Sequence, residues 1–305
     1  MFLQQLVKIT GLSEAYIIKL ARTASHRYRT YQIPKRKSGV RTIDHPSRHL
    51  KFLQRWLVRN IFSYAPVHPS VYSYKEGVSI RQHASLHVKS KYTLRIDFRD
   101  FFPSIKSADV QKLLDKNVER FPFQLTDRDI HIILSLSSKD GKLTIGAPCS
   151  PAVSNAIMYD FDKHWSQRSK RLNVIYSRYA DDIYFSTNRS GVLSKILSEL
   201  KEHLATRDSP RLILNNAKTV FASRKRRRVV TGIVITPTRK LSLGREKKRQ
   251  LRTLTFLFGK GQLDRDRAKS LQGFLSYAST IEPIFISRLR KKFGDELISK
   301  IVQMP

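Results

Sequence analysis

The chain of 305 residues is long enough for a large core, and with 40% hydrophobic residues it is not a disordered polycation. Its 58 Lys and Arg residues outnumber 24 Asp and Glu residues, and the net charge of +34 must be balanced by a dense counterion cloud or by an anionic partner, of which nucleic acid is the leading candidate. An anionic membrane is the rival, but the basic residues are spread along the chain, and no apolar run approaches the roughly 18 residues that span a bilayer.

The N-terminal part is predicted to hold two helices with a basic hairpin between them. Ser13 is an N-cap for a helix within residues 11–24. Residues 28–46 form two short strands around a Lys-Ser-Gly turn. Ser47 is the N-cap of a helix over residues 47–62, because the apolar residues there recur at helical spacing.

The middle of the chain alternates between strand and helix patterns. The segment "YTLRIDF" (92–98) alternates like a strand that ends at Asp97, and residues 108–137 hold two helical patterns. The segment "SPAVSNAIMYDFDKHW" (150–165) is predicted to be one helix, with Pro151 in its first turn, where proline is tolerated.

The remaining elements complete a mixed chain. "IYSRYADDIYFST" (175–187) is predicted to be strand, turn and strand, and residues 191–204 a helix. One strand is predicted near 219–223 and another near 228–236, and the last sixty residues look helical throughout. This mixture predicts an α+β fold class.

Asp181 and Asp182 lie side by side in the strand–turn–strand segment, and Asp97 ends an earlier strand. For the pair alone, ordinary turn chemistry is an equal interpretation, because Asp favours turns. If the strands are neighbours in one sheet, the carboxylates converge and repel one another unless they are neutralised. Hard oxygen ligands suit Mg²⁺, and two such ions about 4 Å apart can clamp an in-line phosphoryl displacement.

Several segments resemble motifs of one protein family. "RIDFRDFFPSI" (95–105), "GAPCSPAVSN" (146–155) and "YADD" (179–182) resemble three motifs of the reverse transcriptases, in the family's order. "VTG" (230–232) is similar to a signature of the retron branch, the bacterial enzymes that make branched RNA-linked single-stranded DNA. Residues 41–61, with "LGREKKRQLR" and "LQGFLSYAS" near the C-terminus, also look like that branch, so the resemblance covers nearly the whole chain.

The resemblance implies a right-hand polymerase with fingers, a palm made of an antiparallel sheet plus helices, and a helical thumb. The fingers and an N-terminal helix would occupy residues 1–90, and the palm residues 91–240, with fingers helices inserted around 107–150. The thumb would occupy residues 241–305.

The resemblance also implies the catalytic and metal-binding residues. Asp97 and Asp181 would be the principal metal ligands, with Asp182 beside them as a weaker third acid. The backbone carbonyl of Phe98 would complete the shell of one metal. The expected cofactor is Mg²⁺, as two ions, with Mn²⁺ as a substitute.

For nucleotide binding, the family places an aromatic residue at the position of Phe102, under the sugar of the incoming deoxynucleotide, where it excludes a 2′-hydroxyl. Core packing is the competing interpretation for Phe102, and Phe101 is expected in the core. Arg41 and Lys35, together with Lys37, lie in the basic hairpin and are expected to bind the triphosphate. A solvated charged hairpin is the alternative for them.

Further nucleotide-site residues follow from the same resemblance. Lys218 in "NNAKT" is expected to approach the triphosphate. Gly146 and Pro148 open a helix, and the glycine would let the backbone approach a base pair closely. Ser150, Pro151 and Asn155 would lie near template and nucleotide.

Two positions depart from the family pattern, since Ile145 stands where Gln is usual and His83 where Asn is usual. His87 matches the pattern. The spacing of His83 and His87 suits metal ligands, but the sequence offers no third ligand, so zinc is the minor interpretation. Cys149 is interpreted as a packed thiol, because no paired base is apparent.

The basic run "RKRRR" precedes "VTG" directly. A charge run alone usually means a solvated face, but beside this signature it suggests a clamp on RNA phosphates and 2′-hydroxyls. The residues expected to bind RNA are Arg224, Arg226, Arg227, Arg228, Val230, Thr231, Gly232 and His87.

The implied function is an RNA-directed DNA polymerase that copies part of a cognate structured noncoding RNA into branched RNA-linked single-stranded DNA, in antiphage defence. Its expected partners are that RNA, which supplies template and primer, the DNA product, deoxynucleoside triphosphates and a separate effector protein, with no membrane. An RNA-binding scaffold or toxin-neutralising subunit is one alternative. A group II intron-like or diversity-generating reverse transcriptase is the other.

The expected location is the bacterial cytoplasm. The N-terminus "MFLQQLVKIT" is too short and too polar for a signal peptide. Cys149 is the single cysteine, so an internal disulfide is excluded, which fits a reducing compartment.

Overall fold

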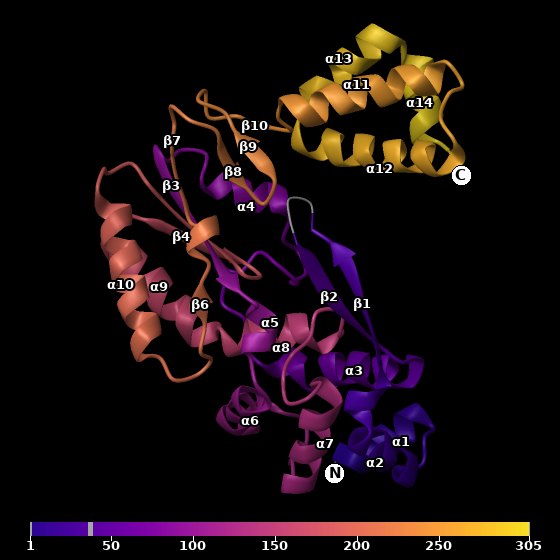
Figure 1. The fold of residues 1–305 in the computed structure, drawn as a ribbon, viewed down its shortest axis with the longest axis vertical. Coiled ribbons are helices and arrows are strands. Elements are labelled where there is room, and N and C mark those ends of the chain that lie inside the picture. The colour runs from indigo at the N-terminus through magenta and orange to yellow at the C-terminus, as the bar shows by residue number, and fades with distance from the viewer. Residues whose placement is uncertain (1, 36–38, 305) are drawn as a thin grey trace. The chain divides into compact units, whose positions relative to one another are not determined.

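The computed structural model describes residues 2–35 and 39–304 (Figure 1). The chain divides into two compact units. The first comprises residues 1–76, 95–183 and 194–219, and the second comprises residues 77–94, 184–193 and 220–305. Both units draw on segments that are distant from one another in the sequence.

The N-terminal part of the first unit has the predicted order of helices and hairpin (Figure 1). Strands β1 (Tyr28–Pro34) and β2 (Val40–Pro46) pair antiparallel, which confirms the basic hairpin. Ser13 caps its helix by accepting a hydrogen bond from the backbone N–H of Tyr16. The helices of this part are α1 (Phe2–Thr10), α2 (Glu14–Arg22) and α3 (Arg48–Asn60).

The helices that follow the first sheet strand also belong to this unit. The predicted helix over 150–165 is two helices, because α8 (Cys149–Ile157) ends at Met158 and α9 (Tyr159–Arg171) begins directly after it. The two helical patterns of residues 108–137 are confirmed. The remaining helices are α5 (Phe101–Ser104), α6 (Ser107–Lys116), α7 (Asp127–Ser137) and α10 (Val192–Thr206).

The largest sheet carries the residues of interest. Its strand order is β4–β5–β3–β6, and β7 also pairs with β3. Asp97 lies inside its strand rather than at the end, since that strand continues to Arg99. The strands are β3 (Tyr92–Arg99), β4 (Ile175–Tyr179), β5 (Asp182–Thr187), β6 (Ile213–Leu214) and β7 (Val220–Ser223).

In the second unit, the segment predicted as one strand near 228–236 is a hairpin. Strand β8 (Arg228–Val230) pairs antiparallel with β9 (Ile233–Ile235), and β9 pairs with β10 (Leu241–Ser242). The two residues between β8 and β9 are Thr231 and Gly232, with φ of 45° and 79°. Positive φ at both central residues is the requirement of a tight hairpin turn, which breaks the strand pattern.

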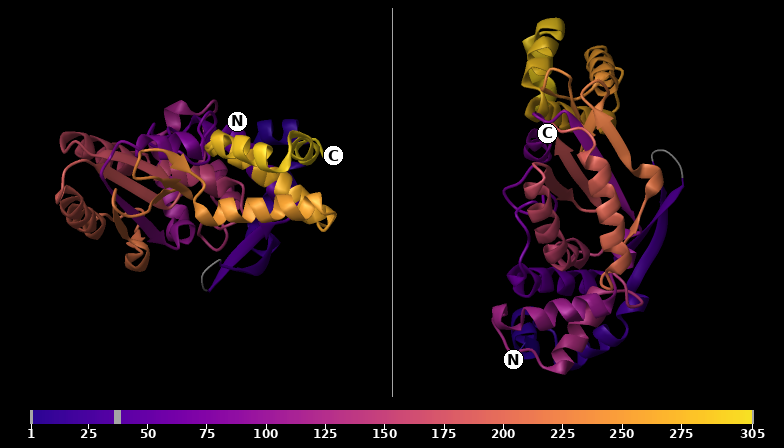
Figure 2. Two further views of the ribbon diagram at one scale, coloured as in Figure 1. Left: turned by 90° about the horizontal axis from the view of Figure 1, so that it is seen from above. Right: turned by 90° about the vertical axis from the view of Figure 1, so that its left-hand side faces the viewer.

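Helices complete the second unit. The last sixty residues fold as four helices that pack against one another, drawn in orange and yellow in Figure 2, which confirms the helical prediction. Helix α4 (Ile80–Leu86) packs against the β8–β9 hairpin. The C-terminal helices are α11 (Arg245–Gly259), α12 (Arg265–Ile281), α13 (Pro283–Phe293) and α14 (Asp295–Val302).

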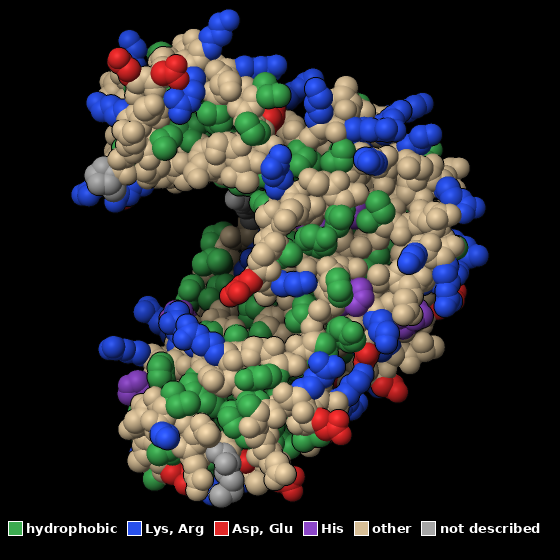
Figure 3. All heavy atoms as spheres, turned by 180° about the vertical axis from the view of Figure 1, so that it is seen from behind, with side chains coloured by type: hydrophobic (Ala, Val, Ile, Leu, Met, Phe, Trp, Pro, Cys, Tyr) green, Lys and Arg blue, Asp and Glu red, His purple; other side chains and the backbone are tan. Residues whose placement is uncertain are grey.

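Figure 3 shows one face of the molecule, on which Lys and Arg side chains are spread widely and acidic side chains are few. This distribution agrees with the composition and favours an extended anionic ligand. Among the described helices, none is long and apolar enough to cross a bilayer.

Candidate active site

The predicted carboxylates meet at the bend between β4 and β5. Ala180 and Asp181 form this bend, and Ala180 has a φ of 55°. The backbone N–H of Phe98 donates to the carbonyl of Asp181 at 3.3 Å, so the bend lies beside Asp97 on β3. Burial, followed by the neighbouring charge of Asp97, raises the pKa of Asp181. The structure therefore brings Asp97 and Asp181 together from distant parts of the sequence.

Asp97 is held by two side chains from the segment after β6. Lys218 Nζ donates to both carboxylate oxygens of Asp97, at 2.9 and 3.0 Å, and Asn215 Nδ2 donates to one of them at 3.1 Å. The side chain of Asp97 is 4% exposed and that of Lys218 55%. The lysine thus supplies a movable positive charge beside a fixed, buried carboxylate.

Asp182 is paired with Arg95, a residue that sequence reasoning missed. The Arg95 guanidinium donates to both oxygens of Asp182, at 2.9 and 3.0 Å. Burial raises the pKa of Asp182 to about 6, Arg95 opposes this rise, and the charge of Asp181 adds to it. The signal for Arg95 was its position two residues before Asp97, which places both side chains on one face of β3.

The donor set fits a divalent cation. Mg²⁺ is typically held by one or two carboxylates together with substrate phosphates, rather than by a complete protein cage. Asp97 and Asp181 supply two carboxylates, and because burial and then the charge of Asp97 raise the pKa of Asp181, an added cation would favour its ionised form. Within the described ranges no three His, Cys, Asp or Glu side chains are grouped as a metal site, and Asp182 is engaged by Arg95.

A buried polar network lies behind the bend and was also missed by sequence reasoning. Arg178 on β4 makes a two-point ion pair with Asp162 on α9, with contacts of 2.8 and 2.7 Å, and both side chains are fully buried. Arg178 also donates to the carbonyl of Ala180 at 3.0 Å. From the other side, Ser73 Oγ accepts from the N–H of Ala180 at 2.7 Å. Both backbone groups of Ala180 are therefore held, which fixes the residue before Asp181.

Asn155, which the sequence places near template and nucleotide, belongs to this network. Its amide donates to the carbonyl of Ser73 at 2.9 Å and accepts from Arg178 at 3.2 Å, and the residue is 1% exposed. Ser150 is also buried and accepts from the N–H of Thr144. Both side chains therefore support the site through hydrogen bonds inside the protein.

The predicted nucleotide-binding residues differ in exposure. Arg41 on β2 is exposed, and its charge lowers the pKa of Asp181, so it acts on the carboxylate site. Lys35 is exposed just after β1, and Lys37 lies outside the described residues. Phe102 is partly exposed, whereas Phe101 is buried and stacks on Phe98 at 5.9 Å, as the core prediction required.

Gly146 approaches protein backbone. Its φ is +112°, and a Cβ at this position would meet the carbonyl oxygen of Asp44 at 2.7 Å. The adjacent Ile145 carbonyl accepts from the N–H of Asp44 at 2.8 Å, so this loop is bound to β2. Pro148 follows at the N-terminal end of α8 and is partly exposed. The structure thus gives the glycine a reason other than contact with a base pair.

Cys149 is a packed thiol, as predicted. It is fully buried, its Sγ donates to the carbonyl of Gln54 at 3.3 Å, and burial raises the pKa of the thiol. A raised pKa keeps the group neutral and unreactive.

The predicted RNA-binding residues separate into exposed and buried sets. Arg226, Arg227 and Gly232 are exposed, and Arg224 and Thr231 are partly exposed. Arg228 and Val230 are buried, and Arg228 donates to the backbone carbonyls of His87 and Ser90 at the end of α4. A buried guanidinium at a helix C-terminus is favourable for the helix dipole. Arg228 therefore acts on the hairpin from inside.

His83 and His87 lie in the interior of the second unit. Both are fully buried, His87 Nδ1 is 2.7 Å from Ser186 Oγ, and the two rings contact Tyr184. The Tyr184 hydroxyl accepts from the N–H of Thr231 at 3.1 Å, so this cluster reaches the β8–β9 turn. Burial lowers the pKa of His83 to about 4 and that of His87 to about 3, so both rings are neutral at pH 7.

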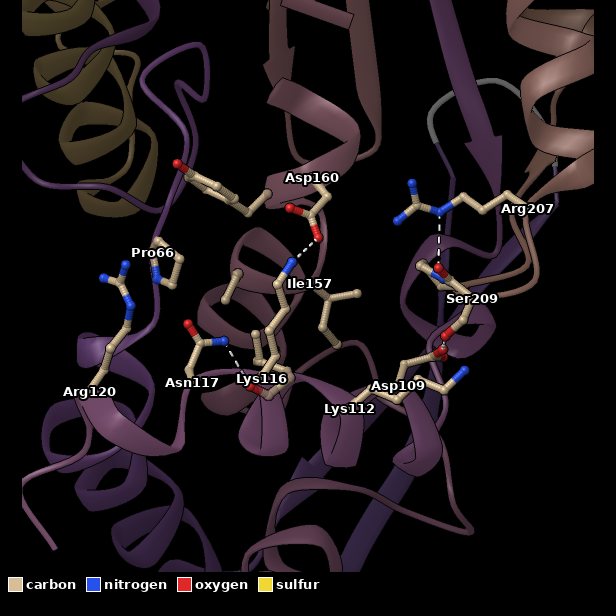
Figure 4. Close-up of a pocket in the computed structure, with 14 residues that line it drawn as sticks. Pro66, Asp109, Lys112, Lys116, Asn117, Arg120, Ile157, Asp160, Arg207 and Ser209 are labelled. Carbon is tan, nitrogen blue, oxygen red and sulfur yellow. Dashed lines mark hydrogen bonds and ion pairs between the residues drawn. The ribbon is translucent and has the colours of Figure 1, made fainter. Parts of the chain in front are cut away.

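A separate cavity of about 320 Å³ lies between α6, the start of α9 and the segment before β6 (Figure 4). Its lining mixes charges: Lys116 pairs with Asp160 at 2.5 Å, and Asp109 accepts from Ser209. Lys112, Arg120 and Arg207 also line it. Both acids of the lining are therefore already engaged by neighbouring side chains.

Comparison with known proteins agrees with this geometry. The family described as reverse transcriptase (RNA-dependent DNA polymerase) matches residues 33–256. Retron Ec83 reverse transcriptase of Escherichia coli is 36% identical over 304 residues, covering 96% of each chain. Retron Ec73 reverse transcriptase of the same species is 34% identical, covering 88% of this chain and 87% of that protein.

Among solved structures, apo telomerase from Candida tropicalis, truncated from its C-terminal domain, has a TM-score of 0.48 at 11% identity, over 70% of this chain and 54% of that one. That similarity is too low to support an assignment by itself. The family match and the two retron relatives are sufficient, and the chain belongs to the reverse transcriptases, RNA-directed DNA polymerases with an α+β fold, and among them to the retron type.

Proposed function

We propose that this polymerase copies part of a cognate structured noncoding RNA into single-stranded DNA that stays joined to the RNA, by nucleotidyl transfer at Asp97 and Asp181. The observation that carries the proposal is the meeting of the buried Asp97 carboxylate and the half-buried Asp181 carboxylate, close to the cationic side chains of Lys218 and Arg41. The retron relatives support the choice of product and template, because they cover almost the whole chain.

The reaction joins a hydroxyl of the primer to the α-phosphorus of a deoxynucleoside triphosphate. The new phosphodiester bond forms as the bond to the β-phosphate oxygen breaks, and pyrophosphate leaves. When bound by Asp97, Asp181 and the Phe98 carbonyl, two Mg²⁺ ions, or Mn²⁺ in their place, supply activation of the hydroxyl and neutralisation of the leaving group.

The chain's own residues have distinct parts in this proposal. Asp97 would hold the metal in place of its contact with Lys218, and the Lys218 side chain, which is 55% exposed, would offer its ammonium to the phosphates. Arg41 and Lys35 hold the triphosphate from the hairpin side. Phe102 contacts the sugar, and Pro148 and Gly146 border the nucleotide.

Recognition of the RNA is assigned to the second unit. Arg224, Arg226 and Arg227 bind phosphates, and the turn at Thr231 and Gly232, in which Gly232 is exposed, contacts the RNA. Arg228, Val230 and His87 are buried, so their part is to hold this turn in place.

The wider biology is proposed by kinship with the retron relatives. A separate effector protein would act together with the RNA–DNA product in defence against phage, in the bacterial cytoplasm. The lone, buried, neutral Cys149 is compatible with that compartment.

Two measurements test the proposal. The first is Mg²⁺-dependent deoxynucleotide incorporation on the copurifying RNA by wild type, Asp97→Asn and Asp181→Asn, with Asp160→Asn as a control, because Asp160 is exposed and paired with Lys116. Loss of synthesis only in the first two variants is expected. The second is analysis of the copurifying nucleic acid for a 2′–5′ branch between RNA and DNA. Equal synthesis by all variants would refute the role of the carboxylates.

A further inference from the structure

The base of the β1–β2 hairpin forms a second strongly basic feature of the first unit, distinct from the carboxylate site. A groove of about 550 Å³ lies between the end of the short helix that precedes β1, the paired ends of β1 and β2, and the first turn of α3. We call it the hairpin-base groove, and it is lined by Arg27, Arg29, His45, Arg48 and Lys51, with His26, Tyr28, Pro46 and Ser47.

The charge of this groove is uncompensated. None of its lining residues, all within the described ranges, is acidic. The ion pairs found among the described residues include none made by Arg29, Arg48 or Lys51. The cavity of Figure 4 differs in this respect, because its lysines and arginines share the lining with Asp109 and Asp160.

The positions of these cations are unfavourable in the protein alone. Arg29 lies directly opposite His45 in the strand register, where two basic side chains gain nothing from each other. Arg48 and Lys51 are in the first turn of α3, which contains no acidic residue, and the Ser47 side chain makes no capping hydrogen bond. A helix N-terminus favours negative charge, so two cations there invert the usual preference.

The walls of the groove are fixed by backbone hydrogen bonds. The N–H of Ser47 donates to the carbonyl of Arg27 at 2.8 Å, and the N–H of Lys51 donates to the carbonyl of Ser47 at 2.8 Å. Arg27 Nε donates to Thr23 Oγ1 at 2.8 Å. The cations are thus presented from a preformed backbone frame, which lowers the entropy lost on binding.

We infer that the hairpin-base groove binds the phosphodiester backbone of RNA, as a nucleic-acid contact separate from the carboxylate site. A volume of about 550 Å³ lies within the range of ligand sites. Three cations without an ion-pair partner in one groove match a chain of phosphates better than a single anion, and each neutralised phosphate releases a counterion. This inference deepens the proposed function, because it takes RNA as the ligand.

The test measures how RNA affinity depends on salt. The probe is a fluorescein-labelled, single-stranded RNA of about 30 nucleotides, bound by the wild type and by the triple variant Arg29→Gln, Arg48→Gln, Lys51→Gln. Each phosphate contact in a single strand contributes about 0.7 to the slope of log affinity against log salt, so the triple variant is expected to lower this slope by about 2.

The matched control is the triple variant Lys116→Gln, Arg128→Gln, Arg290→Gln. It removes the same number of positive charges from positions at which each is already paired with a carboxylate. We expect a change in slope below about 0.5 for this control. Equal changes in both triple variants, or no change in the groove variant, would overturn the inference.

A second measurement uses the wild-type protein and does not depend on the folding of a variant. Acetylation of Lys51 is followed by mass spectrometry without ligand, with the RNA, with dATP and with inorganic phosphate. We expect acetylation of Lys51 to slow when RNA is added and to stay unchanged when dATP or inorganic phosphate is added. Equal protection by dATP or phosphate would assign the groove to free anions instead, and unchanged acetylation with RNA would refute it.

A DNA-synthesis assay on a primed template, at an RNA concentration that saturates the protein, distinguishes failure of this inference from failure of the proposed function. Absence of synthesis by the wild type would count against the proposed function, whereas an unchanged salt slope would count against the groove alone.

Discussion

Arg178 and Asp162 form a two-point ion pair in which neither side chain is exposed, and the same guanidinium holds the carbonyl of Ala180. This pair connects α9 to the bend that carries Asp181. It contributes little as a simple source of stability, because removing two charges from water opposes their attraction. Its effect is to fix the geometry of the bend.

Breaking this pair from one side is therefore expected to be costly. Arg178→Met leaves the buried Asp162 carboxylate uncompensated and should lower the free energy of unfolding by about 3–5 kcal/mol. The double variant Arg178→Met, Asp162→Leu should recover much of that loss but not DNA synthesis, since the carbonyl of Ala180 still lacks its donor. Urea titration and primer extension measure the two effects.

The surface pair of Arg128 and Glu14 provides the control for this prediction. Arg128→Met should cost no more than about 1 kcal/mol, because exposed pairs are weak. Wild-type levels of DNA synthesis by the double variant Arg178→Met, Asp162→Leu would show that this buried ion pair does not position the bend.

Lys218 is expected to compete with the metal for Asp97. In Lys218→Met the carboxylate loses an ammonium at 2.9 Å, so the Mg²⁺ concentration for half-maximal activity should fall. The KM for deoxynucleotides should rise several-fold, because the triphosphate loses a cation. Steady-state kinetics over a Mg²⁺ series separates the two quantities. A higher Mg²⁺ requirement in the variant would contradict the competition.

The buried histidines predict a loss of stability in acid. Their pKa values of about 4 and 3 lie below the ordinary 6.5, so below pH 6.5 the unfolded chain binds protons that the folded chain does not. The stability that they confer is complete above pH 6.5 and is lost as the pH falls towards 4 and then 3. Each contributes about 1.4 kcal/mol per pH unit in that window.

The change in unfolding free energy between pH 7 and pH 5.5 tests this prediction. Replacing both residues, as His83→Gln with His87→Gln, should flatten the pH dependence by up to about 3 kcal/mol over that interval, whatever its effect at pH 7. His131→Gln is the control, because His131 is exposed. An unchanged pH slope in the double variant would show that these rings do not carry the effect.

Replacing two glycines by alanine should change the stability of the protein in opposite directions. Gly146→Ala places a Cβ against the Asp44 carbonyl at 2.7 Å in a left-handed backbone, and should destabilise by about 1–3 kcal/mol. Gly273→Ala, inside α12 with open space around it, should stabilise by up to about 1 kcal/mol. Thermal unfolding of both variants measures the difference. A neutral Gly146→Ala would mean that the loop moves freely away from β2.

Local pattern was sufficient to predict most elements. The hairpin of residues 28–46, the helix after Ser47 and the C-terminal helices follow from periodicity, turn residues and caps. The helix break at Met158 and the turn at Thr231 were not predicted, because the apolar pattern continues through both places. Only the backbone conformation interrupts the predicted helix and the predicted strand. The motif aspartates could be named from the sequence because their spacing is a family property.

The partners of those aspartates could not be predicted in the same way. Arg95 and Arg178 look like ordinary strand residues, and their roles depend on which strand or helix faces them across the fold. Asn155 lies in a recognised motif, yet its contacts turn inward. Pairing between residues distant in sequence is a tertiary property, which periodicity does not encode.

Ala180 has a backbone conformation that L-amino acids rarely adopt. Its N–H donates a hydrogen bond to Ser73, and its carbonyl accepts one from Arg178. The conformational entropy of this bend is therefore lost during folding, before any nucleotide binds. Incoming substrate meets a backbone that needs no rearrangement, and the affinity for it is not diminished by ordering the bend.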